Sequence, residues 1–334
     1  MKKLLVIRFS ALGDIAMTVP VVHDLATQYP DLDITMLSRE MARPLFESLP
    51  SNVHFIAADL KGRHKGLFGL CRLWRDARMS DFDYIADFHD VLRTHWLRAE
   101  GCLRRKKIAK IDKGRKGKKA LTRLKNKVLV QQATSFDRYA KVLEQLGFPI
   151  KPQFVKLDYS SFCETQKATN ETWIGIAPFA KHPAKVYPME KMEQVIKALN
   201  EKENTTVFLF GGGPEENERI ETLWTKYNHV RPAKSPQGLR GELALMGQLD
   251  VMLSMDSANM HLASLVGTRV VTIWGGTHPY AGFLGWNQKA EDCIQSDLPC
   301  RPCSVYGNKP CLRGDYACMK GITPERIFQK LSQK

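Results

Sequence analysis

Short apolar runs and longer helical patterns alternate along the whole chain. In the first half, apolar runs that fit strands lie at residues 4–9, 33–37, 53–57 and 84–87, with helical patterns at 41–49, 67–77 and 136–146. A second series has strand patterns at 173–177, 207–210, 249–255 and 270–274, and a helical pattern at 189–199. Strands that alternate with helices predict the α/β class with doubly wound, parallel sheets.

The length predicts two domains. A chain of 334 residues exceeds the size at which a single hydrophobic core stops growing. Residues 158–172 are polar and show no clear periodicity, so we expect the linker between the domains there. The expected domains are therefore residues 1–160 and residues 161–334, each with its own sheet.

The loop after the first predicted strand carries a candidate catalytic acid. Gly13 permits a tight turn, and Asp14 begins the helical pattern that follows. In an open parallel sheet, ligands bind beyond the carboxyl ends of the strands. Asp14 is therefore either an acid that stabilises the helix N-terminus or a general base in a binding cleft. The run Asp87-Phe88-His89-Asp90 ends another strand, and its spacing favours a loop that lines a cleft over a metal site.

Residues 251–277 follow the pattern strand, loop, helix, strand, loop. Asp256, Ser257 and His261 lie at the end of the first strand, and Gly275 and Thr277 follow the second. One interpretation is structural, with Asp256 or Ser257 as the N-cap of the helix. The other is functional: an anionic or sugar-bearing ligand lies across both strand ends and meets the free N–H groups of the helix.

The composition is that of a globular protein, with 43% hydrophobic and 9% aromatic residues. No apolar run approaches the roughly 20 residues that span a bilayer. The initial MKKLLVIR contains only four consecutive apolar residues before Arg8, which is typical of a buried strand rather than a signal peptide. We therefore expect a cytoplasmic protein without structural disulfides.

The net charge of +15 is concentrated in one segment. Residues 104–127 contain 13 Lys or Arg residues and one Asp, so about +12 of the charge lies there. The pattern predicts a loop with a short basic helix that binds a polyanion. Because no aromatic residue is interleaved for base stacking, we favour a phosphorylated or membrane-borne acceptor over nucleic acid. The basic residues expected to make this contact are Arg104, Arg105, Lys106, Lys107, Lys116, Lys118 and Lys119.

Four cysteines near the C-terminus, Cys300, Cys303, Cys311 and Cys318, begin with a CxxC pair. Four thiols in a short span are compatible with a tetrahedral structural zinc site. Their spacing matches no standard zinc finger, however, so structural zinc is one hypothesis beside that of unligated thiols.

Taken together, these residues resemble the ADP-heptose:lipopolysaccharide heptosyltransferase family, glycosyltransferase family 9, nearly from end to end. The motifs that carry the resemblance are RFSALGD at 8–14 with Pro20, KVYP at 185–188, FGGGPEE at 210–216, DSANMHLA at 256–263, WGGT at 274–277, CRPC at 300–303 and Cys318-Met319. The resemblance implies a GT-B architecture, in which two Rossmann-like domains face each other across a cleft. It also implies transfer of a heptose with inversion, without a cofactor for catalysis.

The resemblance also implies roles for single residues. Asp14 would be the general base, beside Ser10 and Gly13 on the acceptor side, and Lys185 would neutralise the donor phosphates. Asp256, Ser257, Ala258 and His261 would surround the diphosphate and ribose, together with Gly275 and Thr277. Glu216 or Glu215 would accept hydrogen bonds from the ribose hydroxyls. The sequence differs from the common family pattern at Ser257-Ala258, where Thr-Gly is usual.

The leading hypothesis is thus an inverting glycosyltransferase that moves a heptose or related sugar from an ADP-sugar to a phosphorylated lipopolysaccharide core. The expected location is the inner face of the cytoplasmic membrane, where the basic segment meets the anionic surface. Two alternatives are an epimerase or hydrolase of nucleotide sugars on the same fold, and a protein that binds nucleic acid or another polyanion.

Overall fold

The computed structural model describes residues 1–333, and the chain divides into two compact units. The first unit contains residues 1–113 and 133–155, and the second contains residues 114–132 and the chain after Val155. The stretch that we expected as the linker, 158–172, therefore belongs to the second unit. So does 114–132, which we expected in the first domain, because it bonds to partners such as the carbonyl groups of Tyr280 and Pro299.

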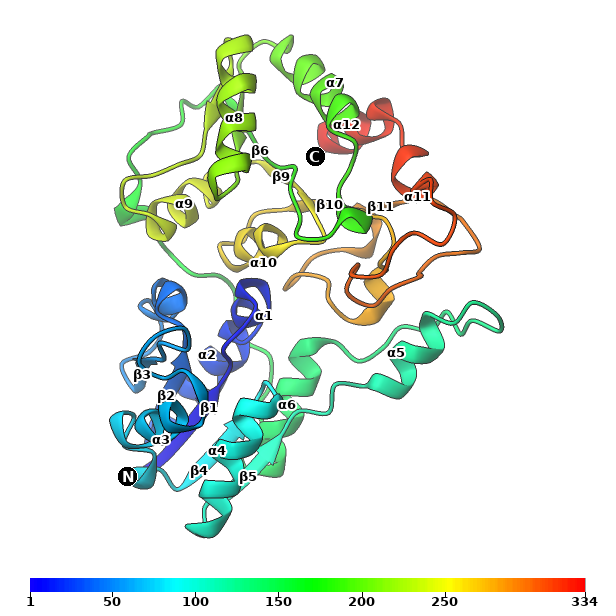
Figure 1. Ribbon diagram of the computed structural model, residues 1–334. Helices are drawn as coiled ribbons and strands as arrows, with labels where there is room; N and C mark the ends of the chain where they lie inside the picture. The colour runs from blue at the N-terminus through cyan, green and yellow to red at the C-terminus, as the bar shows by residue number, and fades with distance from the viewer. Residues whose placement is uncertain (334) are drawn as a thin grey trace. The chain divides into compact units, whose positions relative to one another are not determined.

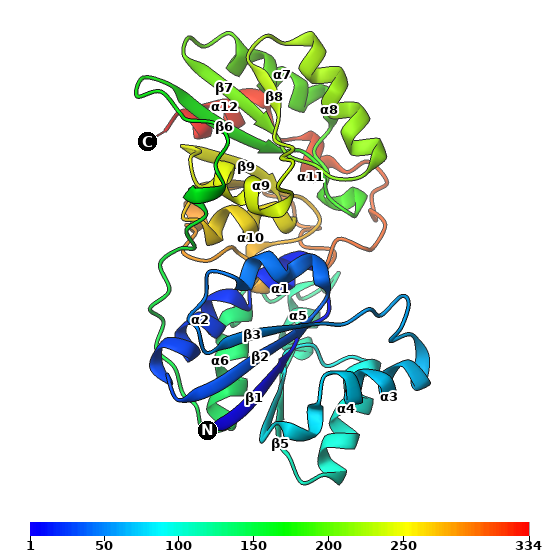
Figure 2. The same ribbon diagram turned by 90° about the vertical axis from the view of Figure 1, so that its left-hand side faces the viewer.

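The first unit is a five-stranded sheet in the order β3-β2-β1-β4-β5, with every pair parallel. Its strands are β1 (Lys2–Ile7), β2 (Leu32–Ser38), β3 (Val53–Ala57), β4 (Tyr84–Asp87) and β5 (Lys107–Lys110). Its helices are α1 (Leu12–Ala16), α2 (Val19–Gln28), α3 (Gly66–Asp76), α4 (Leu92–Leu103) and α6 (Ser135–Gln145), with 3-10 turns η1 (Glu40–Phe46) and η2 (Met79–Asp81) (Figure 2). Leu73 and Trp74 of α3 and Leu97 of α4 pack on one face of this sheet.

The second unit is a six-stranded parallel sheet in the order β11-β10-β9-β6-β7-β8 (Figure 1). Its strands are β6 (Thr172–Ala177), β7 (Thr205–Leu209), β8 (Val230–Pro232), β9 (Val251–Met255), β10 (Val270–Trp274) and β11 (Cys293–Gln295). Its helices are α5 (Arg115–Leu121), α7 (Met189–Asn200), α8 (Pro214–Lys226), α9 (Leu239–Met246), α10 (Ala258–Leu265), α11 (Ala317–Lys320) and α12 (Pro324–Ser332), with 3-10 turns η3 (Ser160–Phe162), η4 (Pro183–Lys185), η5 (Pro279–Ala281) and η6 (Ala290–Asp292). Within residues 1–333, no helix combines the length and apolar character that crossing a membrane requires.

The two parallel, doubly wound sheets confirm the predicted fold class, and two local expectations were wrong. The helical pattern at 41–49 forms the 3-10 turn η1, which contains Pro44; a proline inside a helix removes one of its hydrogen bonds. The basic segment contains the strand β5, which the lysines at its ends concealed. Lysines are common on edge strands because they discourage pairing with other chains.

The strand order places the candidate sites in each unit. β1 lies between β2 and β4, and β6 lies between β7 and β9, so the chain winds in opposite directions from each of these strands. Ligands bind beyond the carboxyl ends of the strands at such switch points. In the first unit this edge follows Ile7 and Asp87, which are paired in the sheet, and in the second it follows Ala177 and Met255.

A buried ion pair stabilises the switch point of the first unit. The carboxylate of Asp87 is fully buried at the end of β4 and is paired with the guanidinium of Arg98 from α4. It also accepts hydrogen bonds from the backbone N–H groups of His89 and Asp90, both at 2.9 Å. Arg98 in turn bonds to the carboxylate of Asp90 at 3.0 Å.

Replacing Arg98 by Met should destabilise the first unit by about 3–5 kcal/mol, because it leaves a buried carboxylate without its cation. Urea denaturation of variant and wild type at neutral pH measures the difference. Arg93→Met is the matched control, since Arg93 is exposed on the same helix, and it should change stability by less than about 0.5 kcal/mol. Equal stabilities of the two variants would show that the ion pair contributes nothing.

Candidate functional site

Asp14 lies in the first turn of α1, directly beyond the end of β1. Its Oδ2 accepts a hydrogen bond from the backbone N–H of Ala11 at 2.9 Å, so it does stabilise the start of the helix. The same oxygen lies 2.8 Å from Nη2 of Arg8, and a third of the Asp14 side chain is exposed. The carboxylate is thus fixed in orientation and still accessible from solvent.

Arg8 is the residue at this edge to which the sequence analysis gave no role. It is buried, and its Nη1 donates a hydrogen bond to the carbonyl oxygen of Phe88 at 2.7 Å. It therefore connects the loop after β1 to the loop after β4 while it holds Asp14. The sequence signal is a cation directly after the buried apolar strand, where an unpaired charge is costly.

His89 supports the same loop from β4. Its Nδ1 accepts the backbone N–H of Phe9 at 3.4 Å, and its Nε2 lies 3.3 Å from Oγ of Ser10. Because Nδ1 accepts, the proton of the neutral ring is on Nε2, which donates to Ser10. Burial lowers the pKa of His89 to about 4 from the ordinary 6.5, and the charge of Arg8 acts in the same direction. The loop that carries Ser10, Gly13 and Asp14 therefore rests on a neutral histidine.

In the second unit, Lys185 and Asp256 meet beyond the ends of β6 and β9. Nζ of Lys185 lies 2.8 Å from Oδ2 of Asp256, whose side chain is only 6% exposed. Gly307 lies against the aliphatic part of Lys185, since a Cβ at Gly307 would come within 2.7 Å of the lysine Cγ. Asp256 is therefore the buried anchor of the pair, and Lys185 is the cation that the loop presents.

The N-terminus of α10 lies next to this ion pair. Ser257 occupies the N-cap position, but its side chain makes no capping bond, and its Oγ lies 3.2 Å from Oγ of Ser254 instead. Ser257 is thus the N-cap residue, as one of the two interpretations of this stretch expected, but its side chain does not satisfy the first N–H groups of the helix. The first N–H groups of a helix without a side-chain cap can bond to an anion. Ala258 is half-buried in this first turn, and His261 is buried one turn further on.

The loop after β10 is held by an arginine that lies between two of the cysteines. Arg301 is buried, and it donates from Nε to the carbonyl of Gly275 at 2.5 Å and from Nη2 to that of Thr277 at 3.0 Å. The N–H of Gly276 bonds to the carbonyl of Ala184 at 2.8 Å, which joins this loop to the loop of Lys185. Oγ1 of Thr277 is buried and has no hydrogen-bond partner among residues 1–333.

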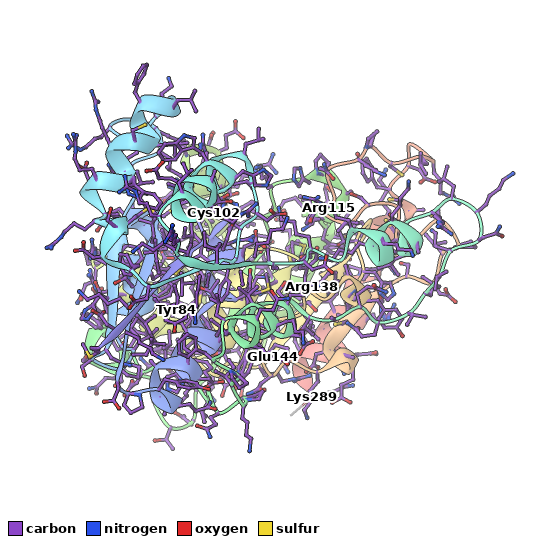
Figure 3. All side chains as sticks on the ribbon, turned by 90° about the horizontal axis from the view of Figure 1, so that it is seen from below. Tyr84, Cys102, Arg115, Arg138, Glu144 and Lys289 are labelled. Carbon is purple, nitrogen blue, oxygen red and sulfur yellow. The ribbon has the colours of Figure 1, made fainter. Side chains whose placement is uncertain are left out.

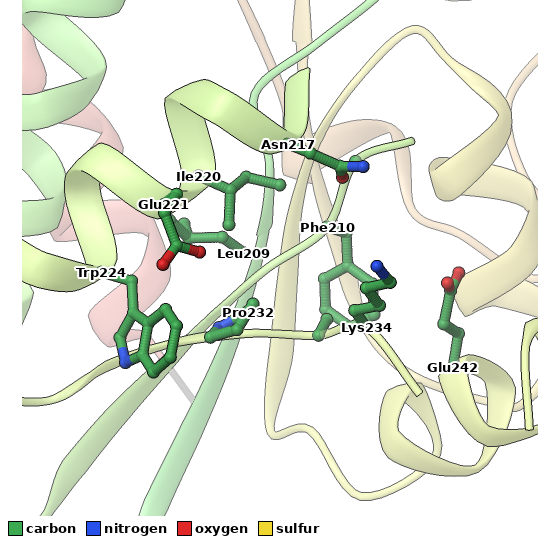
Figure 4. A pocket seen from close by; sticks show the side chains of 11 residues that line it. Leu209, Phe210, Asn217, Ile220, Glu221, Trp224, Pro232, Lys234 and Glu242 are labelled. Atoms are coloured by element: carbon green, nitrogen blue, oxygen red, sulfur yellow. The ribbon is translucent and has the colours of Figure 1, made fainter. Parts of the chain in front are cut away.

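Glu216 has a structural role at the start of α8. Its Oε2 accepts the N–H of Gly212 at 2.8 Å, while Glu215 is exposed beside it. A pocket of about 290 Å³ lies close by, between the end of β7, helix α8 and the residues after β8. Figure 4 shows Trp224 on one side of this pocket, and Lys234 with Glu242 on the other. Burial raises the pKa of Glu242.

The predicted basic contact residues do not form one free cationic strip. Arg104 to Lys107 belong to the first unit, and the other three belong to the second. Several have structural contacts: Arg104 bonds to Glu100, Lys106 to the carbonyl of Ser80, and Lys107 lies 5.6 Å from the ring centre of Tyr84 (labelled in Figure 3). Lys118 is buried against Phe283, with Nζ 4.1 Å from the ring centre.

The cysteines give the zinc hypothesis no support. Among residues 1–333, no three His, Cys, Asp or Glu side chains are grouped so that they could hold a metal ion. Cys318 is instead part of the hydrophobic core of the second unit. Cys303 contacts the carbonyl of Gly276 through its thiol and bonds to the same oxygen through its backbone N–H at 3.0 Å. The segment that contains the cysteines therefore braces the loop after β10.

Known proteins resemble this chain over most of its length. The model of glycosyltransferase family 9 (heptosyltransferase) matches residues 70–311. The lipopolysaccharide core heptosyltransferase OpsX of Haemophilus influenzae is 24% identical over 287 residues, which cover 83% of this chain and 80% of that protein.

Solved structures share the fold. A family 9 glycosyltransferase from Veillonella parvula has a TM-score of 0.75 at 20% identity, covering 99% of this chain and 96% of that chain. The E. coli heptosyltransferase WaaC with ADP has a TM-score of 0.67 at 17% identity, covering 98% of each chain. These structures have two-unit α/β folds like the one described above.

The buried, neutral His89 predicts how stability depends on pH. The unfolded chain takes up this proton as the pH falls through 6.5, whereas the folded chain does so only near 4, so the folded state loses stability across that window. From pH 7 to pH 5, the wild type should lose about 2 kcal/mol more unfolding free energy than His89→Gln, which has no such proton. Urea denaturation at both pH values measures the loss. His54→Gln, at an exposed histidine of β3, should behave like the wild type; an equal loss in His89→Gln would contradict the prediction.

Proposed function

The chain belongs to glycosyltransferase family 9, the heptosyltransferase family, and from this premise we propose that it transfers a heptose or related sugar from an ADP-sugar to a phosphorylated lipopolysaccharide core. The observation that carries the proposal is the difference between the two switch points. One presents an accessible carboxylate, Asp14, and the other presents a cation, Lys185, beside a helix N-terminus. Acceptor activation and departure of a diphosphate need these two kinds of group.

Asp14 is the proposed general base. In the transfer, the acceptor hydroxyl oxygen forms a bond to the anomeric carbon while the bond from that carbon to the diphosphate oxygen breaks. The hydroxyl proton passes to Asp14, and the leaving ADP takes the negative charge. A single displacement by one base inverts the configuration at the anomeric carbon, in line with other inverting enzymes. Arg8 and the N–H of Ala11 keep the carboxylate oriented for this step.

Lys185 and the first turn of α10 are the proposed diphosphate site. Negative charge grows on the diphosphate as the sugar departs, so fixed donors there stabilise the transition state more than the ground state. Asp256 holds Lys185 in position before the donor arrives. Thr277, whose hydroxyl is buried without a partner in residues 1–333, adds a polar group in the adjoining loop.

The pocket beside α8 is the proposed site of the nucleotide base. Its apolar lining includes Phe210 and Pro232, and Lys234 and Glu242 supply polar groups. Glu216 and Glu215 stand near its edge as candidates for ribose contacts; Glu216 would have to share its carboxylate with Gly212. ADP as the nucleotide is supported by the E. coli relative WaaC, which has been solved with ADP and with ADP-2-deoxy-2-fluoro heptose.

Two observations support a lipopolysaccharide core as the acceptor: the names of the relatives and the exposed cations of this chain. OpsX of Haemophilus influenzae and heptosyltransferase 3 of Escherichia coli are both named for lipopolysaccharide. Exposed cations such as Arg105 and Lys116 suit a phosphorylated, lipid-linked core. The proposed place of action is therefore the inner surface of the cytoplasmic membrane, and the transfer itself needs no metal or other cofactor.

Replacing Asp14 by Asn should lower the rate of sugar transfer by at least about 100-fold, the usual contribution of a general base. The amide keeps an oxygen for the N–H of Ala11, so the helix should still form. Transfer is measured with an ADP-heptose donor and a lipopolysaccharide core acceptor, and ADP binding by thermal shift should be unchanged. Asp31→Asn, at an exposed acid of the same unit, is the control and should keep full activity. Undiminished transfer by Asp14→Asn would exclude Asp14 as the base.

Lys185→Gln should lower the melting temperature without ligand, because the buried Asp256 loses its cation. It should also reduce or abolish the further rise in melting temperature on adding ADP, because it removes the cation proposed to bind the diphosphate. Lys181→Gln is the matched control, since Lys181 is exposed in the same loop and should leave the ADP-dependent shift intact. The wild type should respond to ADP more strongly than to UDP or GDP at equal concentration. Stronger stabilisation by UDP than by ADP would contradict an ADP-sugar as the donor. Hydrolysis of the donor in the absence of an acceptor would favour a hydrolase.

A further inference from the structure

Residues 114–132, which we call the basic arm, form a separate stretch of the second unit. The arm contains the helix α5 and the loop that follows it. Its sequence, GRKGKKALTRLKNKVLVQQ, has seven Lys or Arg residues and no Asp or Glu. The arm thus carries a charge of +7 over 19 residues, with no acid of its own to neutralise it.

The same arm exposes large aliphatic side chains. Leu124 is 71% exposed, Val128 45%, Leu129 54% and Val130 57%. Four such residues within seven positions exceed the scattered exposed apolar residues that any protein surface has. Lys116, Lys119, Arg123 and Lys125 of the same arm are also exposed. Exposed apolar and cationic side chains therefore alternate along one short stretch of the chain.

The arm is attached to the second unit at several points. The N–H of Gln132 bonds to the carbonyl of Tyr280 at 2.9 Å, and Nζ of Lys127 bonds to that of Pro299 at 3.0 Å. Leu121 is fully buried, and the N–H of Val128 bonds back to Ala120 at 3.2 Å. In Figure 1 the loop extends beyond α5, and Arg115, labelled in Figure 3, marks the start of that helix. The exposed aliphatic residues thus belong to a segment that is held in place at both ends.

We propose that the basic arm docks the second unit on an anionic lipid bilayer, with the four aliphatic side chains entering the boundary between headgroups and acyl chains and with Lys116, Lys119, Arg123 and Lys125 bound to lipid phosphates. This combination of an apolar edge and a cationic rim is that of interfacial membrane segments. Lys and Arg near an anionic surface each add attraction, and the strength of binding also increases with the apolar area buried at the boundary.

Other occupants fit the arm less well. Nucleic acid would satisfy the cations but not the aliphatic side chains, and the arm has no aromatic residue on which bases could stack. A second copy of the chain would bring its own arm, which also carries +7 and no acid, so a contact between two arms would be repulsive. The proposal rests on the proposed function in one respect: an enzyme whose acceptor is linked to lipid must reach the surface of the bilayer.

The test is flotation of the full-length protein with two kinds of vesicle, one of phosphatidylcholine alone and one of phosphatidylcholine mixed with the anionic lipid phosphatidylglycerol. The wild type should bind the anionic vesicles only, and less at higher salt. The aliphatic variant, Leu124→Asn, Val128→Asn, Leu129→Asn and Val130→Asn together, keeps every charge and should bind at least tenfold more weakly. The cationic variant, Lys116→Gln, Lys119→Gln, Arg123→Gln and Lys125→Gln together, should lose binding to a similar extent.

Two matched controls separate the arm from general surface effects. Leu67→Asn with Phe68→Asn removes two of the most exposed apolar side chains of the first unit, and Lys197→Gln, Lys202→Gln, Arg219→Gln and Lys320→Gln removes four exposed cations elsewhere in the second unit. Both should bind vesicles like the wild type. A cooperative thermal unfolding transition, measured on every variant without ligand, reports that the variant is folded.

Several outcomes would overturn the proposal. They are failure of the wild type to bind anionic vesicles, wild-type binding by the aliphatic variant, loss of binding in the controls instead, tighter binding to an RNA oligonucleotide than to vesicles, or self-association that the aliphatic variant abolishes. Failure of the proposed function has a different signature, because a chain without ADP response or sugar transfer can still float with anionic vesicles through the arm.

Discussion

A carboxylate buried at the end of a central strand must be paired with a cation, and this constraint recurs in both units. In the first unit Asp87 ends β4 and is paired with Arg98, and in the second Asp256 follows β9 and is paired with Lys185. Leaving either carboxylate unpaired would be strongly destabilising. Each pair therefore fixes a loop or helix at the edge of the sheet where ligands bind. The accessible groups, Asp14 in one unit and Lys185 in the other, depend on this buried framework.

At the carboxyl edges of the two sheets, one and the same atom can have both a structural and a chemical role. Oδ2 of Asp14 receives the N–H of Ala11 and the guanidinium of Arg8, yet the side chain stays a third exposed. Glu216 similarly accepts the N–H of Gly212 at the start of α8. An acid that stabilises a helix N-terminus is thereby positioned at the carboxyl end of a strand, so the structural and functional interpretations of Asp14 are compatible. Ser257 differs from these acids, because its Oγ lies 3.2 Å from Oγ of Ser254 and accepts no N–H of the helix.

The sequence predicted the elements whose patterns are local, and it missed partners that lie far apart along the chain. Tyr84–Asp87 and Val270–Trp274 have the predicted bounds because short β-branched or apolar runs are complete signals in themselves. Arg301 lies between Cys300 and Cys303, and this CxxC pair suggested metal binding rather than a role for the arginine. The carbonyl groups to which Arg301 donates are 24 and 26 positions away along the chain. The sequence predicted that the whole basic segment contacts one polyanion, whereas its strand β5 and the basic arm belong to different units. Which cations are neutralised by packing is decided only by the tertiary structure.

Residues 293–332, from β11 to the end of α12, brace the loops that come before them. Arg301 holds the carbonyls of Gly275 and Thr277, and Gly307 supports Lys185. β11 adds the edge of the sheet, and α12 packs on α7. During synthesis on the ribosome, Lys185 and Asp256 emerge well before these supports. The second unit can therefore complete these contacts only after its final residues have been synthesised, and the same order holds for the basic arm, whose Lys127 bonds to the carbonyl of Pro299.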